Sequence, residues 1–116
     1  MIALKDITVF YGLIDHPLHP MLRDLISWMS TRVPKITITC AYEKRPCPSV
    51  HNTVPLRGID IRSTIYSCPK DICADINKHW IYDPERPEYK VANYHDAGRG
   101  IHIHLQVHDN TQFPGA

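Results

Sequence analysis

Residues 100–107 read Gly-Ile-His-Ile-His-Leu-Gln-Val, and no other stretch of the chain limits the fold as strongly. In a β-strand, this alternation places the apolar side chains on one face and His102, His104 and Gln106 on the other. The apolar face is expected to join the core, and the polar face presents two imidazoles roughly 7 Å apart. A solvated edge strand gives the same pattern, so the histidines need partners elsewhere in the chain before they indicate a site.

The composition narrows the class of protein. A chain of 116 residues is expected to form one domain over residues 1–116, with its core at about residues 20–108. The hydrophobic content of 43% and the charged content of 22% are typical of globular proteins. The net charge is +1 without a basic run, which argues against nucleic acid or an anionic membrane as the main partner.

The sequence also predicts where the chain is found. No apolar run approaches the ~18–20 residues of a membrane span, and the first residues lack the pattern of a secretory signal. We therefore expect a chain that is made in the cytosol and stays there unless a lysis system releases it. The four cysteines do not form Cys-x-x-Cys pairs, so we expect reduced thiols at Cys40, Cys47, Cys68 and Cys73.

Apolar periodicity predicts an α+β fold, with two helices packed on a mainly antiparallel sheet. Three- and four-residue spacing predicts one helix from residue 20 to 33, and a cap followed by proline begins another near residue 68. Alternating runs predict strands at residues 35–42 and 57–63 and a hairpin of residues 88–95 and 100–107, with its turn at 96–99. The β-branched and aromatic run at residues 7–11 predicts a short strand or an extended arm.

Two residues outside the 100–107 strand offer metal ligands. Asp60 lies in the middle of a predicted strand, where carboxylates are depleted, and His51 lies in the loop before that strand. A zinc site that performs chemistry uses about three His or carboxylate ligands and leaves a fourth position for water. The chain supplies this set and one further His as a proton acceptor.

These residues resemble a known family. The strand at residues 36–42, Ser49-x-His51 and then Gly58-x-Asp60-Ile61 resemble the ordered motifs of the zinc D-alanyl-D-alanine peptidases, whose superfamily includes lysostaphin-type endopeptidases and the hedgehog domain. Members of the superfamily complete the site with Glu-x-x-His or His-x-His, and residues 102–104 match the second form. The resemblance covers about residues 36–107 and implies a hedgehog- or DD-peptidase-like fold.

The resemblance implies a role for each matched residue. Zinc would be held by His51, Asp60 and His104, and His102 would be the general base or would orient the water. Ser49 matches a position that supports the loop of the first ligand. The ligand imidazoles would donate their other N–H to Glu43, Asp96 or a backbone carbonyl. The implied substrates are peptidoglycan stem peptides or their fragments, hydrolysed at D-Ala-D-Ala or L-Ala-D-Glu bonds.

The chain departs from the family in two places. Eight residues separate His51 from Asp60, where the family usually has six. The family's substrate-polarising Arg falls on Glu43 in the simplest alignment, and Arg45 could replace it through a different loop path. Other candidates for binding a substrate carboxylate are Arg57, Arg62 and Arg99.

Two other functions fit the same residues. A zinc-stabilised binding module or phage structural domain would keep the ligands without turnover. A histidine-triad nucleotide hydrolase or transferase would use the His-x-His-x-Gln strand with no metal, the second His attacking phosphorus. If the purified protein contains stoichiometric zinc, the histidine-triad hypothesis is excluded. If it contains no metal and binds AMP, the peptidase hypothesis is excluded.

Overall fold

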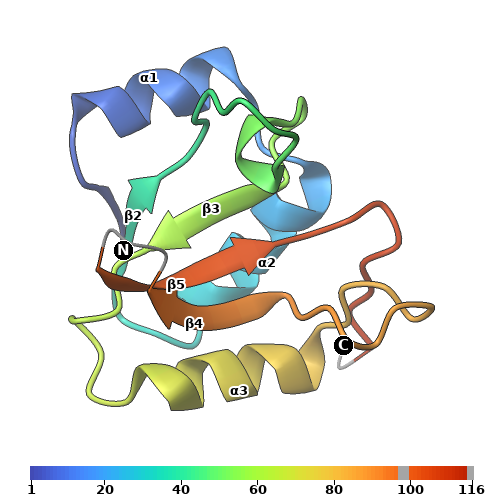
Figure 1. Cartoon of the computed structure of the whole chain (residues 1–116). Coiled ribbons are helices and arrows are strands. Elements are labelled where there is room, and N and C mark those ends of the chain that lie inside the picture. The colour runs from blue at the N-terminus through green and yellow to red at the C-terminus, as the bar shows by residue number, and fades with distance from the viewer. Residues whose placement is uncertain (97–99, 115–116) are drawn as a thin grey trace.

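The computed structural model describes residues 1–96 and 100–114. Its framework is a five-stranded sheet in the order β1-β2-β3-β5-β4, formed by Ile2–Leu4, Ile36–Cys40, Gly58–Ile61, Ile101–Gln106 and Ala92–Asp96 respectively (Figure 1). β1 runs parallel to β2, and the three other pairings are antiparallel. The predicted α+β fold with a mainly antiparallel sheet is confirmed.

The helices of the described residues are α1 (Ile7–Asp15), α2 (Pro20–Ser30), α3 (Pro69–His79) and the short 3-10 helix η1 (Val50–Asn52). α2 and α3 match the two predicted helices, and each begins with proline, whose fixed φ suits the first helical turn. In Figure 1, α2 passes behind the sheet and α3 runs beside β4.

The prediction of a strand or extended arm at residues 7–11 is wrong. These residues begin α1, because Asp6 caps its first turn by accepting a hydrogen bond from the Val9 amide at 3.1 Å. The strand in this region is β1, which precedes the helix and pairs with β2. The third α-helix is therefore an addition to the two that the sequence predicted.

The core lies between one face of the sheet and the helices. Ile59 and Ile61 of β3 and Ile103 and Leu105 of β5 are fully buried there, against the apolar sides of α2 and α3. Ile101, which the alternation also assigns to this face, is 48% exposed because it begins the strand. The opposite face of β3 and β5 carries Asp60, His102 and His104.

The predicted hairpin is present as β4 and β5, paired from Ala92↔Leu105 to Asp96↔Ile101. The turn that the sequence predicts at 96–99 falls largely on residues 97–99, which lie outside the described residues, as does the candidate Arg99. Within the described residues, no helix has both the length and the apolar character needed to span a bilayer.

Candidate metal centre

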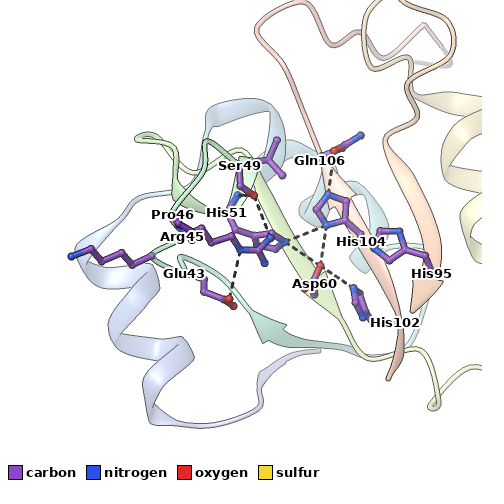
Figure 2. A pocket seen from close by; sticks show the side chains of 12 residues that line it. Glu43, Arg45, Pro46, Ser49, His51, Asp60, His95, His102, His104 and Gln106 are labelled. Carbon is purple, nitrogen blue, oxygen red and sulfur yellow. Dashed lines mark hydrogen bonds and ion pairs between the residues drawn. The ribbon is translucent and has the colours of Figure 1, made fainter. Parts of the chain in front are cut away.

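Three side chains from separate segments meet on the polar face of the sheet (Figure 2). His51 comes from η1, Asp60 from β3 and His104 from β5, and each is at least nine-tenths buried. Oδ1 of Asp60 lies 2.9 Å from Nδ1 of His104 and 3.3 Å from Nε2 of His51. The two imidazole nitrogens are 3.3 Å apart. The sequence-predicted ligand residues therefore lie together, and zinc ligation by them remains a prediction.

The sheet and η1 determine these positions. β3 and β5 pair Asp60 directly with His104, which puts both side chains on one face. η1 is held by a capping box in which the Ser49 hydroxyl accepts from the His51 amide, and the Asn52 side chain accepts from the Ser49 amide. Ser49 thus holds the start of η1, the segment that carries His51.

Gly58 allows η1 to lie close to the sheet. A Cβ at this position would be 2.4 Å from Cγ2 and 2.9 Å from Cβ of Val50, the residue beside His51. Only glycine leaves room for this approach without a shift of one of the two segments. The short distance between His51 and Asp60 therefore depends on glycine, which has no side chain, at position 58 at the start of β3.

The spacing of the three atoms matches a metal polyhedron. Zinc bonds to nitrogen and oxygen of about 2.0–2.1 Å give a tetrahedron whose edges are about 3.3–3.4 Å. The three separations here are 2.9, 3.3 and 3.3 Å. The two separations of 3.3 Å match this edge, and the separation between Asp60 and His104 is shorter.

The hydrogen bonds behind His51 indicate which of its nitrogens carries the proton. Nδ1 lies 3.1 Å from the carbonyl oxygen of Ala41, which can only accept. This contact assigns the proton to Nδ1 and leaves the Nε2 lone pair facing Asp60 and His104. Of the three acceptors that the sequence suggested, a backbone carbonyl fills this place.

Gln106 assigns the tautomer of His104 in the same way. The Gln106 amide nitrogen donates to the Lys90 carbonyl at 2.8 Å, which places its oxygen 3.1 Å from Nε2 of His104. That oxygen can only accept, so Nε2 carries the proton and Nδ1 turns its lone pair toward Asp60. Gln106 thus orients the His104 ring.

As a consequence, three electron-pair donors face one another. The neutral tautomers leave no hydrogen between Nε2 of His51, Nδ1 of His104 and Oδ1 of Asp60, at 2.9–3.3 Å. Buried lone pairs at these distances repel unless extra protons or a cation lie between them. The donor set of two imidazoles and one carboxylate is the type that binds zinc.

Asp60 is ionised in this setting. Burial acts to raise its pKa. When the facing nitrogens of His104 and His51 take up the extra protons that the metal-free cluster needs, their hydrogen bonds and positive charge hold the pKa of Asp60 well below its usual range. The carboxylate therefore attracts positive charge at any pH near neutral.

His102 lies beside the cluster with a free basic nitrogen. Its Nδ1 is 3.1 Å from the carbonyl oxygen of Gly100, which assigns the proton to Nδ1. Nε2 is 3.4 Å from Oδ1 of Asp60 and turns its lone pair toward the cluster. This nitrogen can accept a proton or complete a metal site as a further ligand.

His95 is a further histidine of the site that the sequence analysis did not identify. Its ring stacks on His104 at a centroid distance of 5.6 Å and meets His102 edge-on at 5.0 Å. Burial, and the positive charges that His104 and His102 carry when protonated, lower the pKa of His95, so its ring is a weaker base than a free imidazole. The register of β4 and β5 places His95 opposite His102, and pairing the two runs of the predicted hairpin would have found it.

Cys40 offers an alternative third ligand. Cys40, His51 and Asp60 each supply a donor atom within 4.8 Å of the others, so this buried group could also hold a metal ion. The thiol lies on the Nδ1 side of His51, at 3.9 Å, and donates to the Glu43 carboxylate at 3.3 Å. Burial, the Glu43 hydrogen bond and the Asp60 charge raise its pKa to about 12. The sequence alone predicts only a reduced thiol at Cys40.

A cavity of about 750 Å³ opens in front of the cluster. Arg45 and Ser49 line it with His95 and His102, and the Arg45 side chain lies 3.5 Å from the Ser49 hydroxyl and 3.6 Å from the Glu43 carboxylate. Arg57 binds elsewhere, to the Val107 carbonyl and the Tyr82 hydroxyl. Arg62 lines a neighbouring groove.

Comparisons with protein-family models, curated proteins and solved structures found no match to this chain.

Proposed function

We propose that this protein is a zinc-dependent peptidase that hydrolyses amide bonds of peptidoglycan stem peptides. The observation that carries the proposal is the convergence of three lone pairs, from His51, Asp60 and His104, at the separations of a tetrahedral zinc site. The resemblance of the motifs to zinc D-alanyl-D-alanine peptidases supports the choice of reaction and substrate.

In this proposal, different residues hold the metal and transfer the proton. His51, Asp60 and His104 would hold the zinc, which when bound supplies a Lewis acid that lowers the pKa of water and polarises a carbonyl. Nε2 of His102 accepts the proton from the attacking water and later returns it to the leaving amine. The carbonyl oxygen of Gly100 accepts a hydrogen bond from Nδ1–H, which leaves the Nε2 lone pair available. His95, whose ring meets the His102 ring edge-on, orients that ring.

The cavity offers charged groups of both signs to a peptide. Lys44 and Arg45 line it together with Glu43 and Asp60, and Nε of Arg45 lies 3.6 Å from the Glu43 carboxylate. The Arg45 guanidinium would contact a carboxylate or carbonyl oxygen of the substrate. This is the role that the resemblance gives to an Arg.

Zinc content and hydrolysis, measured together, test the proposal. Purified wild-type protein should hold one zinc per chain and release soluble peptides from purified peptidoglycan, whereas His104→Ala should lose both properties. His79→Ala, on α3 outside the cavity, is the matched control and should retain both. A wild-type protein that holds no zinc, or that hydrolyses peptidoglycan equally well after His104→Ala, would refute the proposal.

One observation favours a second function, a zinc-binding module without turnover. The separation of 3.4 Å between Nε2 of His102 and Oδ1 of Asp60 is also a tetrahedral edge, so His102 could close the fourth position. His102→Ala separates the two functions. A base can be removed with zinc affinity retained and hydrolysis lost, whereas loss of a fourth ligand lowers the zinc affinity itself.

A further inference from the structure

The outward face of helix α1 is apolar. Ile7, Phe10, Tyr11 and Ile14 follow one another at three- and four-residue spacing, so they form a single line along the helix, which we call the α1 stripe. These residues are between 43% and 59% exposed. In the parts of the chain that the structure describes, neither α2 nor α3 exposes a large apolar residue to this extent. α1 lies along the upper margin of the molecule in Figure 1.

The opposite face of α1 is already covered by the fold. Val9 is buried in the core, Leu13 packs against the core, and the Tyr42 backbone lies 3.7 Å from the position that a Cβ would take at Gly12. α1 is therefore apolar on both sides. A helix that is hydrophobic all round is normally buried all round, so the α1 stripe has the character of a surface that a partner covers.

The α1 stripe is large enough to form an interface. About half of each of its four residues is exposed, which gives on the order of 400 Å² of contiguous apolar surface. Exposed apolar patches of this order on a folded protein commonly mark sites of interaction. Stable interfaces bury about 800 Å² on each partner, and weak, transient interfaces bury less. The stripe, with the side chains around it, therefore suits a weak interface.

The charges around the stripe favour a protein partner over a lipid surface. From Ile7 to Asp15, α1 carries no lysine or arginine, and its charged residue is Asp15. Asp6 caps the first turn. Helices that lie on anionic membranes carry lysine and arginine on their polar face. The two central residues of the stripe, Phe10 and Tyr11, are of the aromatic type that is enriched at protein interfaces, and their ring centroids are 6.1 Å apart.

The α1 stripe is symmetric about its own centre, since Ile7 and Ile14 lie at its ends and Phe10 and Tyr11 lie in the middle. A two-fold axis through that centre sets a second helix antiparallel to the first, and each residue of the stripe then contacts the stripe of the partner. We propose that the α1 stripe binds the same stripe of a second copy of this chain and forms a weak antiparallel dimer. Ile7 packs against the partner's Ile14, and Phe10 packs against the partner's Tyr11. Asp15 leaves α1 roughly 90° from the stripe and stays in solvent.

The dimer interface adjoins the candidate metal centre through the end of α1. The ring of His16, the residue that follows α1, stacks on the Tyr42 ring at a centroid distance of 3.5 Å. Tyr42 directly precedes the segment of Glu43 and Arg45, and both of these residues line the cavity in front of the cluster. A second copy that covers α1 therefore also restrains one wall of the cavity.

Sedimentation velocity of the full chain, from about 1 µM to about 500 µM, tests the dimer. We expect a monomer–dimer equilibrium with a Kd on the order of 100 µM. Ile14→Lys should raise this Kd at least about tenfold, because the interface would then bury an ammonium group on each copy. Ile65→Lys is the matched control and should leave the Kd unchanged, since Ile65 is 41% exposed and lies outside α1. Wild type that stays monomeric at about 500 µM would overturn the proposal, as would an unchanged Kd for Ile14→Lys.

A compensating pair of substitutions tests the antiparallel arrangement. Ile7→Glu alone should weaken the dimer, whereas the double variant Ile7→Glu/Ile14→Lys should restore it, because each introduced carboxylate then faces an introduced ammonium of the partner. The two positions lie about 10 Å apart along one helix, so they cannot pair within a copy. A double variant that dimerises no more tightly than either single variant would overturn the arrangement. If wild type is monomeric and floats with phosphatidylglycerol vesicles, a lipid surface covers the stripe and the dimer is refuted.

Discussion

The side-chain oxygen of Gln106 lies 3.1 Å from Nε2 of His104, two residues earlier on β5. Gln106 is held in this orientation by its hydrogen bond to the Lys90 carbonyl, in the segment before β4. The Gln106 side-chain amide therefore stabilises the His104 tautomer in which Nδ1 carries no proton and can bind a metal. Gln106 would not contact the metal itself, but it determines whether His104 can bind one.

This relationship predicts the effect of changing Gln106. Gln106→Leu should lower zinc affinity about 10–100-fold, the usual cost of losing a partner behind a ligand histidine. Gln106→Glu keeps an acceptor oxygen and should retain most of the affinity. Competition with a chromophoric chelator measures both constants, and equal affinities for all three proteins would show that Gln106 has no such role.

Gly58 predicts a coupled loss of stability and metal binding. Gly58→Ala should destabilise the protein by about 1–3 kcal/mol, since its Cβ would overlap Val50 and displace η1 with His51. Zinc affinity should fall in the same variant. Urea unfolding and zinc titration measure the two effects.

Two further variants make the Gly58 test specific. Gly12→Ala should be neutral or stabilising, because a Cβ there makes only ordinary contacts of 3.7 Å or more in the middle of α1. Val50→Ala added to Gly58→Ala should restore zinc affinity by removing the overlapping methyl groups. A failure of this rescue would mean that the steric account is wrong.

Asp60 predicts how the metal-free protein responds to acid. Its pKa is lower in the folded than in the unfolded chain, where it is about 3.9, so the native state binds fewer protons between these values. The stabilisation is therefore complete above about pH 4 and is lost as the pH falls through the folded pKa. In EDTA, the difference in unfolding free energy between wild type and Asp60→Asn should shrink as pH falls below 4. A difference that stays constant from pH 6 to pH 2 would contradict the ion-pair account.

We expect the Cys40 thiol to react slowly with alkylating reagents. Its raised pKa, about 12, and its hydrogen bond to Glu43 leave little thiolate at pH 8, whereas Cys47 and Cys68 are exposed. Iodoacetamide should label the two exposed cysteines at least about tenfold faster than Cys40, as measured by peptide mass mapping. The Cys40 rate should climb as the pH is raised toward 12. Labelling of Cys40 as fast as of Cys47 at pH 8 would contradict this assignment.

Residues with strong local patterns were predictable from the sequence. The 100–107 strand, Asp60 within an apolar strand and the periodicity of residues 20–33 each follow from side-chain alternation that burial enforces. The meeting of the strand and Asp60 with His51 was suggested by the order of motifs, and the structure brings these three segments together as β5, β3 and η1. The helix at residues 20–30 is α2, which packs in the core on the other face of the sheet.

Features that depend on tertiary context were not predictable. Residues 7–11 have strand propensity, but the Asp6 cap and the burial of Val9 favour a helix. The position of Cys40 beside His51 requires the path of the loop between β2 and η1, which spacing along the chain does not encode.

The ligand set of the bound metal is the central claim, and X-ray absorption at the zinc edge tests it most directly. We expect one zinc per chain with only nitrogen and oxygen neighbours at about 2.0–2.1 Å, including two imidazoles, and the same spectrum for Cys40→Ser. A sulfur neighbour at about 2.3 Å that disappears in Cys40→Ser would replace His104 by Cys40 as the third ligand. A protein that binds no zinc would contradict the account altogether.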